Sequence, residues 1–436
     1  MYGTLNPVSL STTLRWIAES AKNREWTFRT LAHHINPELL HDSYRRVRKD
    51  AAPGIDGQTA KEYEANLEAN LQALYERLKE QKYRAPVARR VWIPKDENGK
   101  RPLDLTTFED KIVQRAVVTL LEGIYEEDFY DFSYGYRKGK GCHEAITALW
   151  RETMSGMRWI IDADISSYFT TINHKHLRDF LGKRVEDRSI IRLIGKWLNA
   201  GVLEDRTLSY PEQGTPQGGV ISPLLANIYL HYVLDEWFVK EVEPRLKGKA
   251  YIIRVADDFI IGCQYEEDAR RIMEVLPKRM NKYGLALNAE KTRLLDFSRP
   301  RLDEKKGKST FDFVGFRHYW SKSRKGNWVV KRKTIPKRQR RTMHRIRDWC
   351  RSNRHKSIKE QHKKLCQKLR GHYNYFGVTF NSQAIHVVYR WAQRQWHKWL
   401  NRRGGKSRSW NDFKRGIGNS FPFPPPRIYH SALEYR

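Results

Sequence analysis

Long apolar runs, a secretory signal and clustered cysteines are all missing from this 436-residue sequence. No stretch reaches the roughly 18 consecutive apolar residues that a transmembrane helix needs, so no membrane partner is expected. The N-terminus has no basic segment followed by an apolar stretch, so secretion is not expected either. The 4 cysteines stand apart without a CxxC pair, which excludes a disulfide scaffold and a Cys-rich zinc module. This cysteine usage indicates a reducing compartment.

Acidic residues are scarce in the last third of the chain. Residues 301–436 hold 36 Lys and Arg against 7 Asp and Glu, a net charge of +29 out of +32 for the whole chain. The first 300 residues are close to balanced, at +3. A polyanion is the natural partner of such a basic region, because Lys and Arg displace its condensed counterions. Trp and Tyr residues interleaved with these charges can stack on bases, which favours nucleic acid over a merely soluble basic surface.

Hydrophobic spacing predicts helices toward both ends of the chain. Residues 11–50 and 60–80 have helical spacing and are separated by a loop rich in Pro, Gly and Asp. Residues 265–283 are predicted to form an amphipathic helix. The chain from residue 336 onward is again predicted to be helical, with breaks at Gly371, Gly377 and Gly404–Gly405 and an end at the Pro-rich stretch Phe421–Pro426.

Strands are predicted mainly in the middle of the chain. Val91–Pro94 and Arg101–Leu103 would form a hairpin around the turn Asp96–Lys100. A loop of Gly and Pro at Gln213–Gly219 is expected to open a helix near Ser222. The remaining predicted strands are 159–165, 251–255, 259–262, 310–316 and 327–333.

Carboxylates emerge from an apolar context at two of these places. Asp162 and Asp164 interrupt one strand, and Asp257 and Asp258 form a turn between two others. Buried carboxylates need hydrogen bonds, protonation or a cation, and Mg²⁺ prefers such hard oxygen ligands. Two such ions about 3.5–4 Å apart can activate a 3′-hydroxyl and stabilise a leaving pyrophosphate. Taken alone, the Ala-Asp-Asp turn is weak evidence for catalysis, because Asp is common in ordinary hairpin turns.

Three blocks of the sequence resemble the motifs of reverse transcriptases in order and spacing: Asp164–Phe169, Gly214–Ile228 and Val255–Asp258. The second block is the most specific and is similar to group II intron-encoded reverse transcriptases. The tract Leu369–Gly377 and the Trp-rich helix after it resemble the maturase (X) domain of the same proteins. Supporting blocks are Pro53–Gly57, Ile93–Leu103, Ser133–Arg137, Leu287–Thr292 and Phe313–Phe316.

The resemblance implies an α+β fold, with a right-hand polymerase of fingers, palm and thumb followed by a helical, basic maturase (X) domain. An N-terminal extension and the start of the fingers are expected in residues 1–58, and fingers and palm in 59–310. Thumb and maturase helices are expected in 311–400, and a basic, Pro-rich segment in 401–436. No endonuclease domain is expected after Gly404, because no His-Asn-His pattern with paired CxxC follows it.

Carried over residue by residue, the resemblance assigns catalysis to three carboxylates. Asp164 and Asp257 would be the residues that bridge two Mg²⁺ ions, with Mn²⁺ as the alternative ion, and Asp258 would be the third acidic member. Asp162 competes with Asp164, because positions i and i+2 share one face of a strand. The family places an aromatic residue five positions after its metal ligand, and this favours Asp164.

The same resemblance places the incoming dNTP among residues from several blocks. Phe169 would act as a steric gate against a ribose 2′-hydroxyl, and the alternative is an ordinary core aromatic. Gln217 would line the nucleotide pocket beside Gly218–Gly219, a pair that lets the backbone approach the substrate. Lys95 and Arg101 flank the fingers hairpin and suit triphosphate oxygens, unless they are solvated surface charges. The other implied contacts are the backbone carbonyl of Ile165, which is also a metal ligand, and Lys291, for triphosphate binding or proton transfer.

Three positions depart from the pattern of the family. Val255 replaces the usual Tyr before Ala-Asp-Asp, which keeps both Asp but changes the side chain that approaches the primer end. Ser166–Ser167 replaces a more usual Lys-Gly. Asp104 lies in a Leu-Asp-Leu stretch where the family has Leu-Gly-Ile-Pro. These departures point to a divergent lineage.

The implied function is that of an RNA-directed DNA polymerase that binds structured RNA, an RNA template–DNA primer duplex and dNTPs, and assists group II intron splicing and retrohoming. One alternative is a free-standing reverse transcriptase used by its host for DNA repair or phage defence. Another is a splicing-only RNA-binding maturase, which the intact carboxylates argue against. The expected location is a bacterial cytoplasm near the nucleoid, or an organelle. The densest basic cluster supplies the candidate RNA-phosphate contacts Arg332, Lys333, Lys337, Arg338, Arg340 and Arg341.

Overall fold

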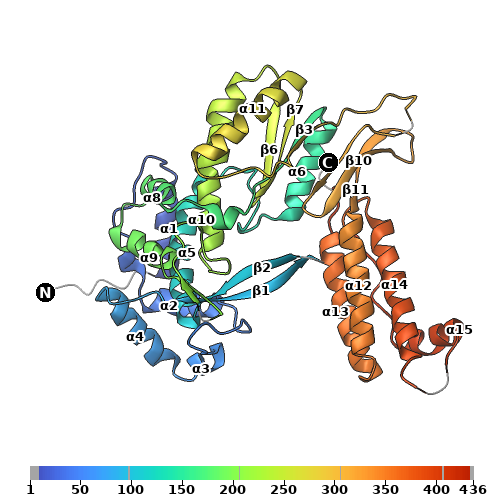
Figure 1. The fold of residues 1–436 in the computed structure, drawn as a ribbon, viewed down its shortest axis with the longest axis horizontal. Coiled ribbons are helices and arrows are strands. Elements are labelled where there is room, and N and C mark those ends of the chain that lie inside the picture. The colour runs from blue at the N-terminus through green and yellow to red at the C-terminus, as the bar shows by residue number, and fades with distance from the viewer. Residues whose placement is uncertain (1–8, 97–98, 206, 305, 405–406, 433–436) are drawn as a thin grey trace. The chain divides into compact units, whose positions relative to one another are not determined.

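The structure, a computed structural model, describes residues 9–96, 99–205, 207–304, 306–404 and 407–432 (Figure 1). The chain forms two units, and each takes residues from three separate stretches of sequence. The first unit draws on residues 1–139, 164–245 and 272–290. The second unit draws on residues 140–163, 246–271 and 291–436. The four consecutive segments expected from the sequence describe a different division and stay a prediction.

A long buried helix forms the centre of the first unit. The helices of this unit are α1 (Leu10–Ala21), α2 (Pro37–Arg46), α3 (Ala60–Glu64), α4 (Leu67–Lys79), α5 (Phe108–Asp128), α7 (Tyr168–Thr171), α8 (His174–Gly182), α9 (Arg188–Leu198) and α10 (Ser222–Leu230). Helices α1, α2 and α10 pack against α5. Helix α5 is buried on nearly all sides, so its sequence lacks the one-sided apolar stripe by which exposed helices are recognised.

The continuous helix predicted over residues 11–50 is wrong in its middle. The chain leaves the helical conformation between α1 and α2, and a loop around Leu31 takes its place. The buried carboxylate of Asp187, just before α9, accepts the backbone N–H groups of Leu31 at 2.6 Å and Ala32 at 2.8 Å. A side chain more than 150 positions away in sequence therefore satisfies the backbone of this loop, and no local pattern reveals it.

The first unit also contains the predicted fingers hairpin. Strands β1 (Ala88–Asp96) and β2 (Gly99–Leu105) pair antiparallel, with Arg90 opposite Asp104 and Ile93 opposite Arg101. The sheet continues through β4 (Val202–Glu204) and β5 (Thr207–Ser209), in the order β2-β1-β4-β5. The tip of the hairpin, at residues 97–98, lies outside the described residues.

A four-stranded sheet lies at the centre of the second unit. Its strands are β3 (Trp159–Asp164), β6 (Ala250–Val255), β7 (Asp258–Cys263) and β8 (Arg293–Asp296), in the order β6-β7-β3-β8. Ile160, Ile161, Ile252, Ile253 and Ile260 are buried, which explains the near-continuous apolar runs of these strands. Helix α6 (Cys142–Met154) packs against β6. The amphipathic helix predicted over 265–283 is α11 (Glu266–Lys282), whose residues belong partly to each unit.

A second sheet of this unit has the order β11-β10-β9. The strand predicted over 310–316 is divided, because β9 (Thr310–Phe313) turns at Val314–Gly315 into β10 (Phe316–Lys322). Strand β11 (Trp328–Thr334) follows the prediction closely. Helix α6 contacts β11, and the indole N–H of Trp150 donates to the Val330 carbonyl at 2.8 Å.

His318 lies in this second sheet without exposed surface, stacked on Phe311 and paired across the strands with Arg332. Burial and the nearby guanidinium lower the pKa of His318 to about 3. The unfolded chain, with a His pKa near its ordinary value of about 6.5, therefore takes up a proton first as the pH falls. We expect the free energy of unfolding to fall by about 2 kcal/mol between pH 7 and pH 5 from this residue alone.

Urea unfolding at the two pH values measures this effect. The His318→Phe variant, which keeps an aromatic ring on Phe311, is expected to lose about this amount of the pH dependence, while His372, whose pKa burial lowers to about 4, keeps its own contribution. An unchanged dependence in the variant would assign the acid sensitivity to other groups.

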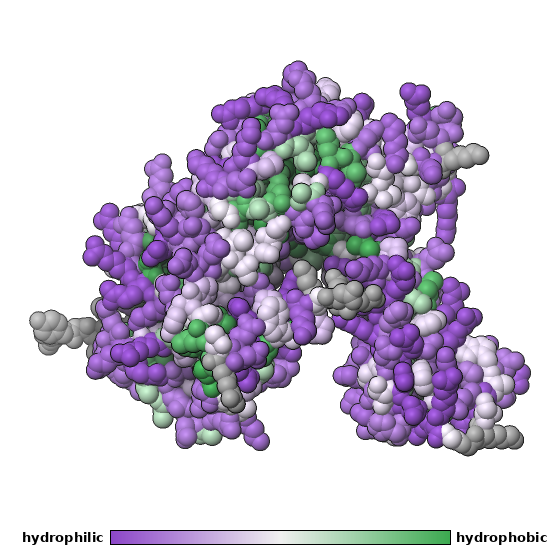
Figure 2. All heavy atoms as spheres, viewed as in Figure 1, coloured by the Kyte–Doolittle hydropathy of each residue, from purple (hydrophilic) through white to green (hydrophobic). Residues whose placement is uncertain are grey.

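A helical bundle forms the C-terminal region of the described chain (Figure 1). It consists of α12 (Pro336–Ser352), α13 (Ile358–Phe376), α14 (Ser382–Leu400) and α15 (Trp410–Phe413). Its core contains Cys350, Leu369, Val388 and Trp396. The face of the bundle seen in Figure 2 is mostly hydrophilic, as the charge of this region predicts. In the described parts of the chain, every helix is too short or too polar to reach across a lipid bilayer.

Glycine behaves differently at the two predicted breaks within this bundle. Helix α13 continues through Gly371, so that predicted break is wrong. At Gly377 the helix ends as predicted, and a larger residue does not fit there, since an added Cβ would lie 2.4 Å from the Tyr373 carbonyl oxygen. The Pro-rich segment after α15 has no helix and returns to the bundle, where the ring of Phe423 stacks 5.0 Å from that of Trp396.

Candidate active site

Two adjacent carboxylates lie at a tight turn between buried strands of the second unit. Val255 of β6 pairs with Asp258 of β7, so Ala256 and Asp257 form the two-residue turn. Ala256 has a φ of +58°, and positive φ values are what two-residue hairpin turns require. Asp257 and Asp258 are both half-buried. The hairpin predicted from the sequence is therefore confirmed, and it places both acidic residues where β6 and β7 join, at one end of the sheet.

A buried arginine supports this turn. Arg254 of β6 has no exposed surface, and its Nη1 donates to the carbonyl of Ala256 at 3.1 Å. A cation this close to the turn lowers the electrostatic cost of holding two carboxylates side by side. Sequence reasoning missed Arg254, although a single charged residue inside an apolar strand was a visible signal.

The turn between β9 and β10 lies against Asp258. The N–H of Val314 donates to Asp258 Oδ2 at 3.4 Å, and the Val314 carbonyl accepts the hydroxyl of Tyr375 at 2.7 Å. The φ of Gly315 is +94°, and an added Cβ there would lie 3.0 Å from Arg338 Nη1. A predicted RNA contact, Arg338, is thus separated from a predicted catalytic residue, Asp258, by one turn of backbone.

Asp162 already has a partner in the sheet. Its Oδ2 accepts Nη2 of Arg293, on β8, at 3.1 Å and Nε of the same residue at 3.2 Å. A carboxylate held by a guanidinium is less available to a metal ion. This contact makes Asp162 part of the pairing between β3 and β8.

Past the end of β3, the chain pairs with a neighbouring segment of the first unit. The carbonyl of Asp164 accepts the N–H of Asn288 at 2.8 Å, and the N–H of Ser166 donates to Ala286 at 2.8 Å. In such an antiparallel pair the residue between the two bonds directs its own N–H and C=O to the opposite side. The carbonyl of Ile165 is therefore directed away from the neighbouring segment, where a ligand can use it.

Phe169 is half-buried in the short helix α7 of the first unit. Its carbonyl accepts the N–H of Thr215 at 2.7 Å. The preceding residue of that loop, Gly214, has a φ of +91°, and an added Cβ would lie 2.9 Å from Thr170 Cα. These contacts tie the segment of Phe169 to the glycine loop that carries Gln217.

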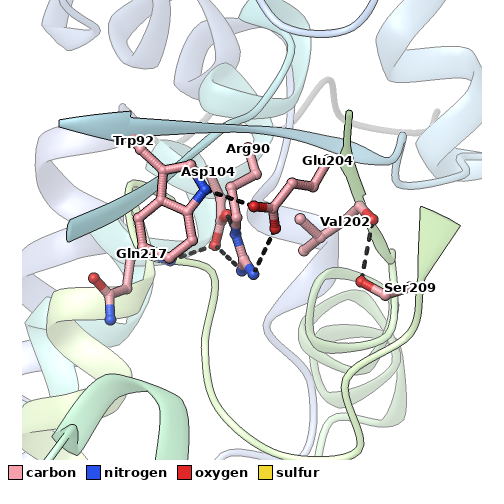
Figure 3. Close-up of polar contacts among 7 residues, drawn as sticks. All are labelled: Arg90, Trp92, Asp104, Val202, Glu204, Ser209 and Gln217. Atoms are coloured by element: carbon pink, nitrogen blue, oxygen red, sulfur yellow. Dashed lines mark hydrogen bonds and ion pairs between the residues drawn. The ribbon is translucent and has the colours of Figure 1, made fainter. Parts of the chain in front are cut away.

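Gln217 is held through its backbone by Asp104 of β2 (Figure 3). Its N–H donates to Asp104 Oδ2 at 3.0 Å, and its carbonyl accepts the N–H of Asp104 at 2.6 Å. The next residue, Gly218, has a φ of +129°, and an added Cβ would lie 2.6 Å from the Asp104 carbonyl oxygen. Only glycine fits this close approach of loop and strand.

Helix α5 supports the same loop from another side. Gln114 Oε1 accepts the N–H of Ile221 at 3.3 Å, and Gln114 Nε2 donates to Asp110 Oδ2 at 2.8 Å. Burial raises the pKa of Asp110 to about 6. Sequence reasoning missed both side chains, because α5 showed no pattern that marked its polar residues as structural.

The predicted phosphate-binding cations are only partly placed. Arg101 is exposed on β2. Lys291 is also exposed and is the first residue after the stretch 272–290 of the first unit. The side chain of Lys95 lies outside the described residues.

The family model described as reverse transcriptase (RNA-dependent DNA polymerase) matches residues 93–318, just over half of the chain. The chain belongs to the reverse transcriptase family. The α+β polymerase fold followed by a basic helical region, predicted from the sequence, is confirmed.

This reverse transcriptase is similar to several curated proteins. It is 33% identical over 345 residues to protein YkfC of Escherichia coli K12, covering 70% of this chain and 86% of that one. It is 30% identical over 292 residues to the group II intron-encoded protein LtrA of Lactococcus lactis, covering 64% of this chain and 49% of that one. It is 26% identical over 203 residues to nuclear intron maturase 4, mitochondrial, of Arabidopsis thaliana, covering 46% and 24%. The matched part thus spans most of YkfC but about half of LtrA.

One predicted RNA contact of this reverse transcriptase is wrong. Arg332 is only 1% exposed, and its Nη1 donates to the carbonyl of Ile146, on α6, at 3.0 Å. Burial lowers the pKa of Arg332 to about 10. Its guanidinium stabilises the contact between α6 and β11 and cannot reach a phosphate outside. The other members of the cluster stay predictions: Lys333, Lys337, Arg338 and Arg340 are exposed, and Arg341 is half-buried.

Proposed function

We propose that this reverse transcriptase copies structured RNA into cDNA by two-metal nucleotidyl transfer, and that its C-terminal bundle binds intron RNA as a maturase does. The observation that carries the proposal is the β6–β7 turn, which contains Asp257 and leads into Asp258. The buried Arg254 donates to the carbonyl of Ala256, whose backbone has a positive φ, and this contact supports the turn. The names of LtrA and of the plant maturase support the intron role.

Mg²⁺ fits the donor atoms of the proposed site, with Mn²⁺ as the alternative ion. Asp164, Asp257, Asp258 and the carbonyl of Ile165 offer only hard oxygen donors. Within the described residues, no group of three or more His, Cys, Asp or Glu side chains could hold a metal ion by itself. Mg²⁺ usually keeps several waters and shares its site with substrate phosphates, and these would complete the coordination. When bound, the ions supply charge that favours ionisation of the primer 3′-hydroxyl and departure of pyrophosphate.

The remaining residues bind and orient the incoming nucleotide. Gln217, on a loop held by Asp104, lines the pocket for the base and sugar. Phe169 occupies the volume that a ribose 2′-hydroxyl needs, and Arg101 contacts the triphosphate. Because these side chains fix position and the primer hydroxyl attacks, no protein nucleophile is required.

The C-terminal bundle supplies the proposed RNA surface. Besides the exposed cations at the start of α12, it carries a cleft of about 450 Å³ lined by Arg351, Arg354, Trp399 and Arg402. The indole N–H of Trp399 is buried and has no hydrogen-bond partner in the described structure. Three guanidinium groups and one unused donor are groups that an RNA phosphate can satisfy.

Reversing the charges of Arg338 and Arg340 to Glu tests this surface. We expect RNA affinity to fall at least about tenfold near physiological salt and the slope of log K against log[salt] to decrease by about 1 to 2. Filter binding from 50 to 300 mM salt measures both quantities. The matched control reverses Lys247 and Arg270, exposed cations of the same unit that are ion-paired with Glu267 and Glu266. If RNA affinity falls equally in both variants, only the net charge of the protein matters, and Arg338 and Arg340 do not contact RNA specifically.

Primer extension on an RNA template with Mg²⁺ and dNTPs tests the polymerase activity. The expected result is full-length cDNA, with competing intron-like RNA reducing extension through the C-terminal surface. RNA binding without primer extension would contradict the polymerase proposal. The remaining hypothesis would then be a splicing-only RNA-binding maturase. A host role in repair or phage defence is not favoured by relatives named as intron-encoded proteins. Location in a bacterial cytoplasm or an organelle stays a prediction.

A further inference from the structure

An ionic contact lies buried between the fingers hairpin and the Gln217 loop (Figure 3). Asp104 is 2% exposed. Its Oδ1 accepts Nε of Arg90 at 2.8 Å, and its Oδ2 accepts both Arg90 Nη2 at 3.3 Å and the Gln217 N–H at 3.0 Å. One carboxylate thus binds a cross-strand guanidinium on β1 and the backbone of the loop.

One carboxylate at position 104 serves both partners, and a glycine there would serve neither. Burying an ion pair is weak evidence for stability, because well-packed apolar residues often do as well. The better-supported use of such a pair is to fix one arrangement of neighbouring segments.

We propose that Asp104 is a positioning residue that locks the Gln217 loop onto the fingers hairpin and so preorganises the dNTP pocket. The proposal rests on the function proposed above, because it assumes that Gln217 faces the nucleotide. Both backbone groups of Gln217 bond to Asp104, while Figure 3 shows its side chain directed away from that carboxylate. Fixing the backbone therefore fixes the direction in which the Gln217 side chain meets substrate.

The contacts of Arg90 extend to the neighbouring strand, β4. Arg90 Nη1 lies 3.7 Å from Oε2 of Glu204 on β4, and the other oxygen of Glu204 accepts the indole N–H of Trp92 at 2.5 Å. Arg90 is therefore held from two sides, by carboxylates on β2 and β4. A series of contacts runs from Gln217 through Asp104 and Arg90 to Glu204. It crosses strands β2, β1 and β4 and fixes the position of the loop on the fingers sheet.

Single-nucleotide incorporation by Asp104→Gly and Asp104→Asn tests the proposal. We expect KM for dNTP to rise about tenfold to a hundredfold, the range for losing one hydrogen bond to a charged group. The affinity for the template–primer duplex should stay within about twofold, because Asp104 is buried beneath the pocket. Arg90→Met should raise KM similarly, and the double variant should be no worse than either single one, because both remove one coupled unit.

Hydrogen exchange of the 213–220 peptide tests the lock without relying on catalysis. Exchange should accelerate about tenfold or more in Asp104→Gly, because the Gln217 amide loses its acceptor, and by less in Asp104→Asn, which keeps one amide oxygen. Asp187→Asn is the matched control: its carboxylate is 6% exposed, lies in the same unit and accepts backbone N–H groups of another loop. This control should lose stability with KM for dNTP and exchange of 213–220 unchanged.

Each outcome decides the question. Faster exchange and higher KM in the Asp104 variants, but not in Asp187→Asn, support the positioning role. A lower melting temperature with normal KM and normal exchange of 213–220 would overturn it and leave Asp104 as a fold-stabilising residue. If the wild-type enzyme extends no primer while the Asp104 variants still exchange faster than the wild type, the positioning contact stands and the polymerase function is overturned instead.

Discussion

Asp257→Ala is expected to reduce DNA synthesis at least about a thousandfold, because a carboxylate that holds a catalytic metal supplies several kcal/mol of transition-state stabilisation. RNA affinity should stay within a few-fold, since the basic bundle is distant in sequence and unaltered in charge. The β6–β7 hairpin should also survive, because its buried strands and the Arg254 contact to Ala256 do not involve the Asp257 side chain. Primer extension beside filter binding measures both quantities, and retained synthesis would sink the assignment.

A pair of isosteric variants on β3 provides the sharpest control. Asp164→Asn should abolish synthesis like Asp257→Ala, whereas Asp162→Asn should retain most of it, because Asp162 is bound to Arg293. The two positions lie two residues apart on one strand, so general damage to the sheet would affect them equally. The reverse outcome would exchange their roles and move the metal ligand to Asp162. The Mg²⁺ concentration for half-maximal activity of each variant reports the same distinction.

Phe169→Ala is expected to raise the acceptance of ribonucleotides relative to deoxyribonucleotides by about tenfold to a hundredfold, the range by which removing a steric clash changes discrimination. The reason is that the half-buried ring of Phe169 lies on a segment bonded to the loop that carries Gln217. The ratio of kcat/KM for rCTP and dCTP, measured by single-nucleotide incorporation, gives the effect directly.

Two variants separate a gate from a packing residue. Phe169→Tyr keeps the ring and should discriminate like the wild type. Tyr168→Phe removes the hydroxyl that donates to Ala226 at 2.5 Å and should change stability without changing sugar selection. If Phe169→Ala lowers stability while the ribonucleotide ratio stays constant, Phe169 is an ordinary core aromatic.

The features that the sequence predicted correctly share a local cause. The β6–β7 hairpin follows from two short apolar runs around a two-residue turn, and the end of α13 at Gly377 follows from one residue without a Cβ. The basic C-terminal region needs only a count of charges, and the family follows from several motifs in order. Each of these features depends on residues that are neighbours in sequence, so patterns of period, turn and composition reveal them.

The failures involve partners that lie far apart in the chain. Arg332 looked like a phosphate contact because its sequence neighbours are cations, but α6 buries it through Ile146. Gly371 was read as a break, yet α13 runs through it because Leu369 and Tyr373 on either side pack into the core of the bundle. Helix α5 was missed because burial on all sides removes the amphipathic signal.

The sequence by itself determined the family, the candidate carboxylates and the sign of the charge expected of a partner, because motif order, residue identity and net charge are one-dimensional properties. Only the tertiary structure decided which of those charges remain accessible. In the folded chain Asp162 forms an ion pair with Arg293, and Asp104 binds both Arg90 and the backbone of Gln217. Arg254 donates to the turn that contains Asp257. A charged side chain acts on substrate or on the fold according to what surrounds it, and those surroundings come from segments that only folding brings together.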